Sequence, residues 1–408
     1  MSAPLNLEGP ISNEAPVSPR EIAFREGLRV WAEVDLDLVV ANVRVLKRQA
    51  GDARLLVVVK GNAYGHGAVP IARASIDAGA WGLGVVDLDE GEELRRAGIT
   101  APILVLGSSA IALAPRLVES DLRVTAGSLA MGQALSTAAQ VVGRDAIVHV
   151  KVETGLNRFG VLPEEAVALA ESLRSLPGVV VEGLSTHLAS VDEGDKTFTY
   201  EQYAAFRAAA DRLPWVPLHH VSSTGALLDL PDLRLALVRS GIGVYGYYPG
   251  EVSHDAPLRP VLSLRSRIAR VSELHEGETV GYGRTWTADR PGRVALAMAG
   301  YADGLHRSLS NQGVALVRGK RVPLIGRVAM DMLMLDITKM SEVDIDDEVT
   351  LIGRQGDAEI TADEVARLSG TISYEVLAGI MARVPRLYVR AGNIIARHDL
   401  SGYRETPA

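Results

Sequence analysis

Short apolar runs alternate with longer amphipathic segments over roughly the first 240 residues of the chain. Eight runs rich in Val, Leu and Ile have the length of buried strands: Leu55–Val59, Trp81–Val86, Ile103–Leu106, Leu122–Thr125, Ile147–Val152, Val179–Leu184, Leu218–Val221 and Leu235–Val238. Segments between them have helical spacing, such as Glu90–Ala97, Glu164–Arg174 and Tyr200–Leu213. This alternation predicts a parallel sheet, and eight units predict an α/β fold of the (β/α)8 barrel type. The structural alternative is a doubly wound sheet, whose dinucleotide-binding version is disfavoured because no GxGxxG follows the first strand.

The pattern changes after about Arg259. Shorter, often alternating runs separated by Gly, Asp and Pro predict a mostly-β domain. Its expected strands are Leu262–Val271, Arg293–Ala299, Val314–Val317, Arg321–Arg327 and Glu348–Ile352, with helical pattern near Thr361–Leu368 and Tyr374–Met381. A chain of 408 residues also exceeds the size of one hydrophobic core. We therefore expect a barrel over residues 29–258 and a C-terminal β domain over residues 259–400, with a first strand near residues 30–36 that could join either domain.

Composition narrows the class of protein. Residues 1–28 contain four prolines and scattered acids, which predicts a flexible tail and not a signal peptide. No run reaches the roughly 18 apolar residues of a membrane helix, and a net charge of −8 argues against nucleic acid or an anionic membrane as partner. The chain has no cysteine, which excludes disulfides and thiolate chemistry. We expect a cytoplasmic protein that acts on small molecules without a metal.

Candidate chemistry follows the predicted strands. Barrel enzymes place their active sites at the carboxyl ends of the strands. Residues of reactive type stand there after the first, fifth, sixth, seventh and eighth strands: Lys60; Lys151 and Arg158; His187; Ser222, Ser223, Thr224 and Gly225; and Arg239, Gly241 and Ile242. Each alone has an ordinary structural explanation, such as a lysine that reaches solvent or a turn-forming serine. Their convergence on one barrel mouth favours a site.

The last two strand ends are the usual phosphate site of such barrels, built from backbone N–H groups. Ser222–Gly225 and Gly241-Ile242 lie at that place. A lysine at a strand end opposite a phosphate cradle suggests a Schiff base with pyridoxal phosphate.

Val58-Val59-Lys60-Gly61-Asn62-Ala63-Tyr64-Gly65-His66-Gly67 resembles the cofactor-lysine signature of alanine racemases. The similarity continues in order through Trp31-Ala32-Glu33, Thr154-Gly155 with Arg158, Thr186-His187, Arg239 with Gly241, Gly281-Tyr282-Gly283 with Thr285-Trp286, Gly300-Tyr301-Ala302-Asp303-Gly304, Gly326-Arg327-Val328 with Met330-Asp331, and Arg383-Val384-Pro385-Arg386. It covers the chain from about residue 29 to residue 397.

The resemblance implies an isomerase that interconverts L- and D-alanine with pyridoxal phosphate and supplies D-alanine for peptidoglycan. It implies that Lys60 and Tyr282 act as acid–base groups on opposite faces of the substrate, with His187 and then Arg239 assisting Tyr282. Arg239 would also bond the pyridine nitrogen. Because an arginine stays protonated, the ring would be a weaker electron sink than beside an aspartate, which should suppress transamination.

The resemblance also assigns binding residues. Those implied for the cofactor are Lys60, Tyr64, His187, Ser223, Thr224, Arg239, Gly241, Ile242 and Tyr301. Arg158 and the backbone N–H of Met330, with the adjacent Asp331, would bind the substrate carboxylate, since an arginine fork suits that group. Lys151 matches a lysine that is often carbamylated in the family, where its negative charge steadies the arginine.

Tyr282 and Met330 belong to the second expected domain. In the family that domain reaches the barrel mouth of a partner subunit, so the resemblance implies a head-to-tail homodimer with composite active sites.

The sequence departs from the family pattern at several positions. The phosphate loop, commonly Ala-Asn-Ser-Ala, reads Ser222-Ser223-Thr224-Gly225 here; Ala329 replaces a common cysteine and Met332 a common glutamine. Ala382 stands where some members have a tyrosine that narrows the entrance, which leaves room for serine. A serine or broad-specificity racemase is therefore the first alternative. Decarboxylases of the same barrel-plus-β plan use a cysteine near the active site, and this chain has no cysteine. A non-catalytic pyridoxal-phosphate-binding protein is disfavoured because it would not need the second domain.

Overall fold

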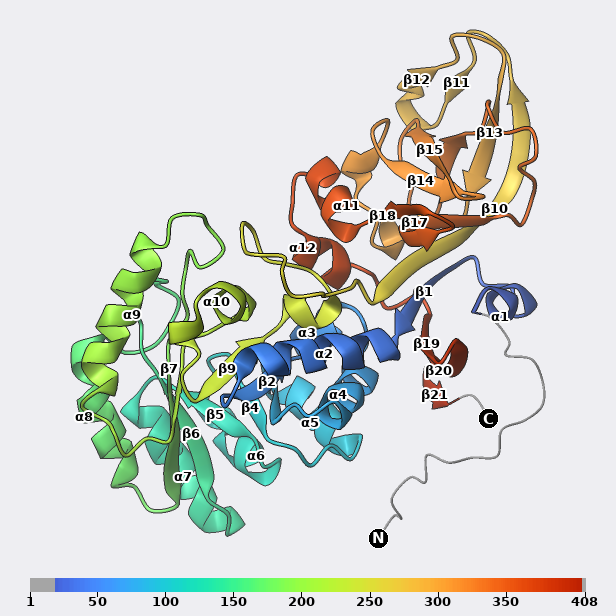
Figure 1. The fold of residues 1–408 in the computed structure, drawn as a ribbon. Helices are drawn as coiled ribbons and strands as arrows, with labels where there is room; N and C mark the ends of the chain where they lie inside the picture. Colours follow the sequence, from blue (N-terminus) through green and yellow to red (C-terminus); the bar gives the residue numbers. More distant parts are fainter. Residues whose placement is uncertain (1–18, 406–408) are drawn as a thin grey trace. The chain divides into compact units, whose positions relative to one another are not determined.

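The computed structural model describes residues 19–405, which form two compact units. One unit is continuous, from Leu38 to Arg259. The other combines the chain up to Asp37 with the chain from Pro260 onward. In Figure 1 the continuous unit runs from blue to yellow, and the discontinuous unit holds the orange and red elements together with the first blue strand.

The continuous unit is the predicted barrel. Its eight strands are all parallel: β2 (Arg54–Val58), β3 (Gly82–Val85), β4 (Ile103–Val105), β5 (Arg123–Ala126), β6 (Ala146–Lys151), β7 (Val179–Ser185), β8 (Leu218–His220) and β9 (Leu237–Ser240). Neighbours follow chain order from β2 to β8, and β9 pairs with β2. Two backbone hydrogen bonds close the ring between the regions of β8 and β9, from Ala236 N–H to His219 O and from Arg239 N–H to Ser222 O. The eight predicted strands and the barrel fold are confirmed.

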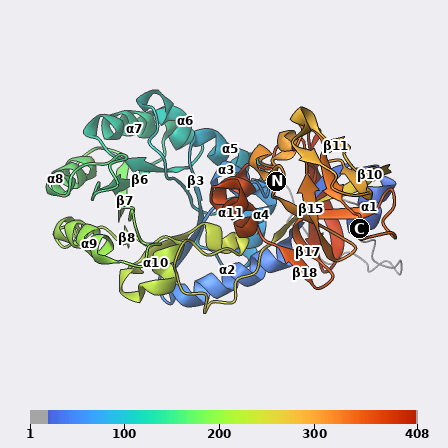
Figure 2. The same ribbon diagram turned by 90° about the horizontal axis from the view of Figure 1, so that it is seen from above.

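Helices cover the outside of the ring, as Figure 2 shows. They are α2 (Leu36–Ala50), α4 (Ala68–Asp77), α5 (Leu88–Arg96), α6 (Ala114–Glu119), α7 (Leu129–Val142), α8 (Pro163–Arg174), α9 (Thr197–Ala210) and α10 (Thr224–Asp229). Local sequence sets where they begin: Asp87 and Ser128 accept hydrogen bonds from the first turns of α5 and α7. Gly143, in the left-handed region, ends α7.

The discontinuous unit is mostly β, as predicted. Its large sheet has the order β18-β17-β14-β15-β16-β13-β10-β1-β19-β20-β21. The strands are β1 (Val30–Asp35), β10 (Leu262–Leu274), β13 (Gly292–Ala297), β14 (Val314–Val317), β15 (Lys320–Ile325), β16 (Leu333–Asp336), β17 (Glu348–Gln355), β18 (Ala358–Ile360), β19 (Arg386–Arg390), β20 (Asn393–Asp399) and β21 (Gly402–Glu405). Pairing of β10 with β17 closes part of this sheet into a ring. Helices α11 (Ala362–Ser369) and α12 (Ser373–Ala378) interrupt the β pattern.

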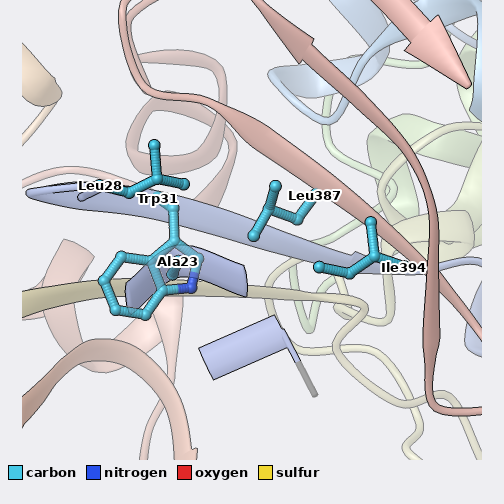
Figure 3. Close-up of a cluster of buried hydrophobic side chains, with 5 residues drawn as sticks. All are labelled: Ala23, Leu28, Trp31, Leu387 and Ile394. Atoms are coloured by element: carbon cyan, nitrogen blue, oxygen red, sulfur yellow. The ribbon is translucent and has the colours of Figure 1, made fainter. Parts of the chain in front are cut away.

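Strand β1, which the sequence left open between the two domains, lies between β10 and β19 of this unit. Its Trp31 is fully buried and packs with Leu28, Leu387 and Ile394 (Figure 3). The same cluster contains Ala23 of helix α1 (Pro19–Arg25).

Helix α1 corrects the expectation of a tail that reaches residue 28. Residues 1–18 of that predicted tail lie outside the described residues, but Pro19 to Arg25 are helical. Proline suits the first turn of a helix, and burial of Ala23 against Trp31 stabilises the segment. Within residues 19–405 no helix is both long and apolar enough to cross a membrane.

Candidate active site

Lys60 stands just beyond the carboxyl end of β2, at the start of a left-handed turn. The turn, α3 (Lys60–Tyr64), has positive φ at four successive residues, Gly61 (62°), Asn62 (53°), Ala63 (53°) and Tyr64 (52°). A left-handed conformation costs a non-glycine residue about 1–2 kcal/mol. Such strain persists only where the surroundings fix it, and it concentrates at functional sites.

Two side chains fix this turn. Glu90 accepts hydrogen bonds from Gly61 N–H (2.6 Å, Oε1) and from Val86 N–H (2.7 Å, Oε2). Asn62 Oδ1 accepts from Ala68 N–H at 2.9 Å, at the start of α4. Glu90 was not predicted as a site residue, because nothing in the sequence distinguishes it from the other acids of its predicted helix.

Five of the predicted residues gather around the barrel mouth. The pKa of His187 lies well below its usual value, first through burial and then through repulsion by Arg239, Arg158, Lys151 and Lys60, in that order. Coulomb repulsion weakens with distance, so these four basic groups lie near enough to the imidazole to oppose its protonation; Arg239 Nη2 is 3.4 Å from His187 Nδ1. Residues from four separate strand ends therefore face one place.

This crowding changes the protonation of the lysines. Burial, then Arg158, lowers the pKa of Lys60, while Glu90 raises it. Burial, then Arg239, lowers the pKa of Lys151 to about 7. Both amines consequently lose a proton more readily than a free lysine does. Burial, then Arg158, lowers the pKa of Arg239 to about 10, so this side chain stays charged at neutral pH.

Arg239 is held by both of its terminal nitrogens. Nη2 donates to the carbonyls of Thr186 (2.9 Å) and Val221 (3.1 Å) and lies 3.4 Å from His187 Nδ1. Nη1 lies 2.6 Å from His220 Nδ1 and donates to the His220 carbonyl at 3.1 Å. No hydrogen bond joins Nε to another group within residues 19–405, so Nε is the donor that remains for a ligand. His220 was not predicted as a site residue.

Lys151 is the last residue of β6, and Arg158 lies in the loop that follows. Glu153 folds it by accepting from Gly155 N–H (2.7 Å) and Arg158 N–H (3.1 Å). Lys151 is buried and donates from Nζ to the Val152 carbonyl at 3.0 Å, whereas Arg158 is exposed. The end of β6 and its loop thus contribute a buried amine and an exposed guanidinium.

The last two strand ends form a close-fitting cradle. A methyl group added at Gly241 would lie 2.4 Å from the Tyr64 hydroxyl, so the backbone there comes close only because it is glycine. The Thr224 hydroxyl lies 3.0 Å from Ser240 Oγ and accepts from Gly241 N–H at 3.2 Å. Thr224, predicted as a ligand contact, therefore also shapes the loop. Ser223 precedes α10, and Ile242 begins the short helix η3 (Ile242–Tyr245).

The remaining predicted residues belong to the discontinuous unit. Tyr282 stands between Gly281 and Gly283, both at positive φ, on the connection from β11 (Thr279–Val280) to β12 (Trp286–Thr287). It is 72% exposed. Tyr301 and Met330 are also exposed, and Asp331 is half-exposed.

Tyr301 and Met330 are positioned by one buried carboxylate. Asp303, with no exposed surface, accepts from Arg29 (2.6 Å), Arg383 (2.9 Å) and Gly300 N–H (2.9 Å). Arg383 also bonds Asp331 at 2.5 Å. Backbone bonds from Tyr301 N–H to the Ala329 carbonyl and from Ala302 N–H to the Met330 carbonyl hold the two loops side by side. Of the four predicted residues of this unit, Tyr301, Met330 and Asp331 thus lie on two connected loops, and Tyr282 lies on an exposed hairpin.

Two family models match the chain. "Alanine racemase, N-terminal domain" covers residues 34–249, and "Alanine racemase, C-terminal domain" covers residues 261–388. The alanine racemase of Clostridium perfringens is 42% identical over 373 residues, which are 90% of this chain and 97% of that protein. The alanine racemase of Symbiobacterium thermophilum is 45% identical over 371 residues, which are 89% of this chain and 98% of that protein.

Solved structures agree. The alanine racemase of Clostridium difficile 630 matches with a TM-score of 0.87 and 35% identity, over 91% of this chain and 98% of that one. The alanine racemase of Bacillus anthracis with bound L-Ala-P matches with a TM-score of 0.84 and 36% identity, over 91% of this chain and 97% of that one. The resemblance seen around Lys60 is confirmed over both units: this chain is a racemase, an isomerase, and belongs to the alanine racemase family.

Proposed function

We propose that this chain interconverts L- and D-alanine with pyridoxal phosphate as its cofactor. The observation that carries the proposal is the barrel mouth, where the lowered pKa of Lys60 favours a neutral amine among Lys151, Arg158 and Arg239. A reactive lysine of this kind needs a deprotonated amine, and the neighbouring Arg158 and Arg239 suit a ligand that carries anionic groups. The relatives that match over nine-tenths of the chain carry the name alanine racemase.

The residues present fit the cofactor. Lys60 would hold it covalently, and the close backbone at Gly241 with the Tyr64 hydroxyl, Ser223 and Ile242 would receive its phosphate. The remaining donor of Arg239, Nε, would face its ring nitrogen, and Tyr301 would add a phosphate contact. When bound, the cofactor supplies an electron sink that lowers the barrier to loss of the substrate's α-proton.

This chain's own groups would move the proton. Lys60 Nζ takes or returns it on one face of the substrate, and Tyr282 Oη of the partner subunit does so on the other. His187, kept neutral by burial and by the cations around it, assists the tyrosine together with Arg239. Arg158, the Met330 N–H and Asp331 hold the substrate carboxylate, so the α-carbon stays between the two proton-transferring groups.

Lys151 is proposed to be carbamylated. A neutral amine adds to CO2 and releases a proton, and the pKa of Lys151 of about 7 leaves a large neutral fraction at physiological pH. The resulting negative charge would steady Arg158. Mass analysis of gently handled protein should find the added CO2, with activity rising in bicarbonate; the plain amine with bicarbonate-insensitive activity would contradict the assignment.

We propose that the two proton-transferring groups of one site come from two chains. We infer a head-to-tail homodimer with composite sites, which would supply D-alanine for peptidoglycan. A Lys60→Ala chain and a Tyr282→Phe chain, each inactive alone, should recover part of the activity when they form heterodimers. Confirmed heterodimers without any activity would contradict shared sites.

An assay in D2O identifies the substrate. Purified holoenzyme receives L-alanine or, separately, L-serine, and optical rotation and α-deuterium incorporation are followed. Rapid racemisation of alanine that Tyr282→Phe abolishes would support the proposal. Cofactor absorbance without deuterium exchange would refute it.

Serine is the second candidate substrate, because Ala382 and Met332 replace larger or more polar residues of the family pattern. A kcat/KM for serine above that for alanine would establish it. Ala382→Tyr should then reduce serine turnover more than alanine turnover.

A further inference from the structure

A row of hydrogen-bonded side chains crosses the barrel interior from β9 to β5. It starts at Arg239 Nη1, which lies 2.6 Å from His220 Nδ1. His220 Nε2 lies 2.8 Å from His149 Nδ1, and His149 Nε2 lies 2.9 Å from Glu182 Oε2. Arg123 ends the row by donating to both carboxylate oxygens of Glu182, at 2.7 and 3.2 Å. The function described so far uses only the first residue of this row.

The barrel wall is deformed where the row passes. In the pairing of β6 with β7, Val148 is opposite Val181 and His149 is opposite Gly183, so Glu182 is an extra residue in β7. Such a bulge redirects a side chain and is common beside active sites. A methyl group added at Gly183 would lie 2.2 Å from His149 Nδ1, so this glycine provides the space for the ring.

The hydrogen bonds can run in only one direction. A guanidinium only donates, so His220 Nδ1 accepts. A neutral His220 then carries its proton on Nε2 and donates to His149 Nδ1, and His149 donates from Nε2 to Glu182 by the same logic. Each ring is thereby restricted to one tautomer.

Burial keeps both rings neutral. His149 and His220 are 0% and 1% exposed. Burial lowers the pKa of both, with repulsion from Arg239 the next cause for His220, while Glu182 opposes the shift for His149. Burial would raise the pKa of Glu182, but bonds from His149 and Arg123 outweigh it and lower that pKa to about 2. The row therefore has a fixed cation at one end and a fixed anion near the other.

We propose that Glu182 is a positioning residue of the racemase site, which acts through His149 and His220 to fix the Arg239 guanidinium. The carboxylate sets the tautomer of His149, His149 sets that of His220, and His220 presents a lone pair to Nη1. With Nη2 already held by two carbonyls, the orientation of Nε is then determined. The inference rests on the proposed role of Arg239 at the cofactor ring, because fixing Nε matters only if Nε meets a ligand.

Histidine nitrogen NMR of the pyridoxal-phosphate-loaded enzyme tests the row directly. Protein labelled with 15N in histidine reports the tautomer of each ring, and His149→Gln and His220→Gln assign the signals. Both rings should be neutral Nε2–H tautomers from pH 6 to 8. An Nδ1–H tautomer or an imidazolium at His220 would overturn the proposal.

Two variants of Glu182 test the link to Arg239. Glu182→Leu removes the acceptor, so the His220 nitrogen signals should change and kcat should fall roughly tenfold, the loss expected for a hydrogen bond to a charged group. KM should change less than about twofold, because the substrate contacts remain. Glu182→Gln keeps an acceptor oxygen, so the His220 tautomer should persist with a smaller loss of kcat. Unchanged His220 signals and kcat in Glu182→Leu would overturn the proposal.

Glu92→Gln is the matched control. Glu92 accepts two bonds from Arg116, at 3.1 and 2.7 Å, in a pair on the barrel exterior. The Glu92→Gln substitution should leave the His220 signals and kcat unchanged. If Glu182→Leu does not fold, the wild-type tautomers and Glu182→Gln still decide the matter. A wild type that fails to racemise would refute the proposed function, while the tautomers would still test the row.

Discussion

The close approach of Gly241 to Tyr64 gives a prediction whose size can be worked out. In Gly241→Ala the new methyl would lie 2.4 Å from the Tyr64 hydroxyl and 3.1 Å from its ring carbon Cζ, so the ring or the loop must move by about 0.6 Å to restore even a 3.0 Å contact. Tyr64 cannot move freely, because it is buried and its ring lies 4.7 Å from that of Tyr245. Overpacking of this kind costs about 1–3 kcal/mol.

The assay is thermal unfolding of the apoprotein, so that lost cofactor contacts do not contribute. A cost of about 2 kcal/mol lowers Tm by roughly 4–8 °C in a domain of this size. Tyr64→Phe removes the hydroxyl that makes the closest contact, so the double variant should regain at least half of the loss. Equal destabilisation by Gly241→Ala with Tyr64 or with Phe at position 64 would refute the reasoning. In the holoenzyme, the single variant should also bind pyridoxal phosphate more weakly.

Three further predictions follow from buried or strained groups. In a urea titration, Asp303→Asn should lower the free energy of unfolding by about 3 kcal/mol, since it leaves Arg29 and Arg383 without their shared anion. As a control, Asp331→Asn should lower it by less than about 1 kcal/mol, because Asp331 is half-exposed. Glu90→Gln removes the charge that raises the pKa of Lys60, so labelling of the apoprotein amine should extend to lower pH; an unshifted profile would contradict the contact. His220 stays neutral in the folded protein but is protonated in the unfolded chain below about pH 6.5, so the free energy of unfolding should fall below that pH by up to about 1.4 kcal/mol per pH unit for this ring. Urea titrations at pH 7.5 and 5.5 should show a smaller fall in the free energy of unfolding for His220→Gln than for the wild type.

Continuous apolar runs made the barrel predictable. Apart from Arg54 and Val180, no residue of its strands is exposed, and such strands are readable from sequence without knowledge of their partners. The strands β19 to β21 were not predicted, because arginines interrupt their apolar pattern. Arg386 shows why: it is 2% exposed, and its guanidinium donates to the carbonyls of Ile380, Met381 and Val384. A charged residue that satisfies buried backbone groups looks the same in sequence as one that faces water.

The residues of the site also differ in how far the sequence predicts them. Lys60 and Arg239 were predictable because reactive groups at strand ends of a barrel share one mouth. Glu90 and Glu182 were not, since their roles depend on the folded structure: Glu90 of α5 bonds backbone N–H groups of Gly61 and Val86, and Glu182 of β7 bonds side chains from β5 and β6. A signal did exist for the interior row: His149 and Glu182 are polar residues inside otherwise apolar strands. The left-handed conformation of Ala63 and Tyr64 had no such signal, because glycine and asparagine are the residues that favour this region and alanine and tyrosine rarely adopt it.

The position of β1 in the sheet has a consequence for synthesis of the protein. Val30 pairs with Ser266, and Ala32 pairs with Arg386. At about 5–20 residues per second, a ribosome needs roughly 20–70 s to travel from Ala32 to Arg386. During that time the barrel, whose chain is uninterrupted, can fold, and β10 can pair with one edge of β1, but the β1 edge that pairs with β19 lacks its partner and Trp31 lacks its contacts with Leu387 and Ile394. The newborn chain therefore keeps one edge of β1 unpaired until translation is nearly finished, and a chaperone that binds apolar extended segments would find its target at that edge.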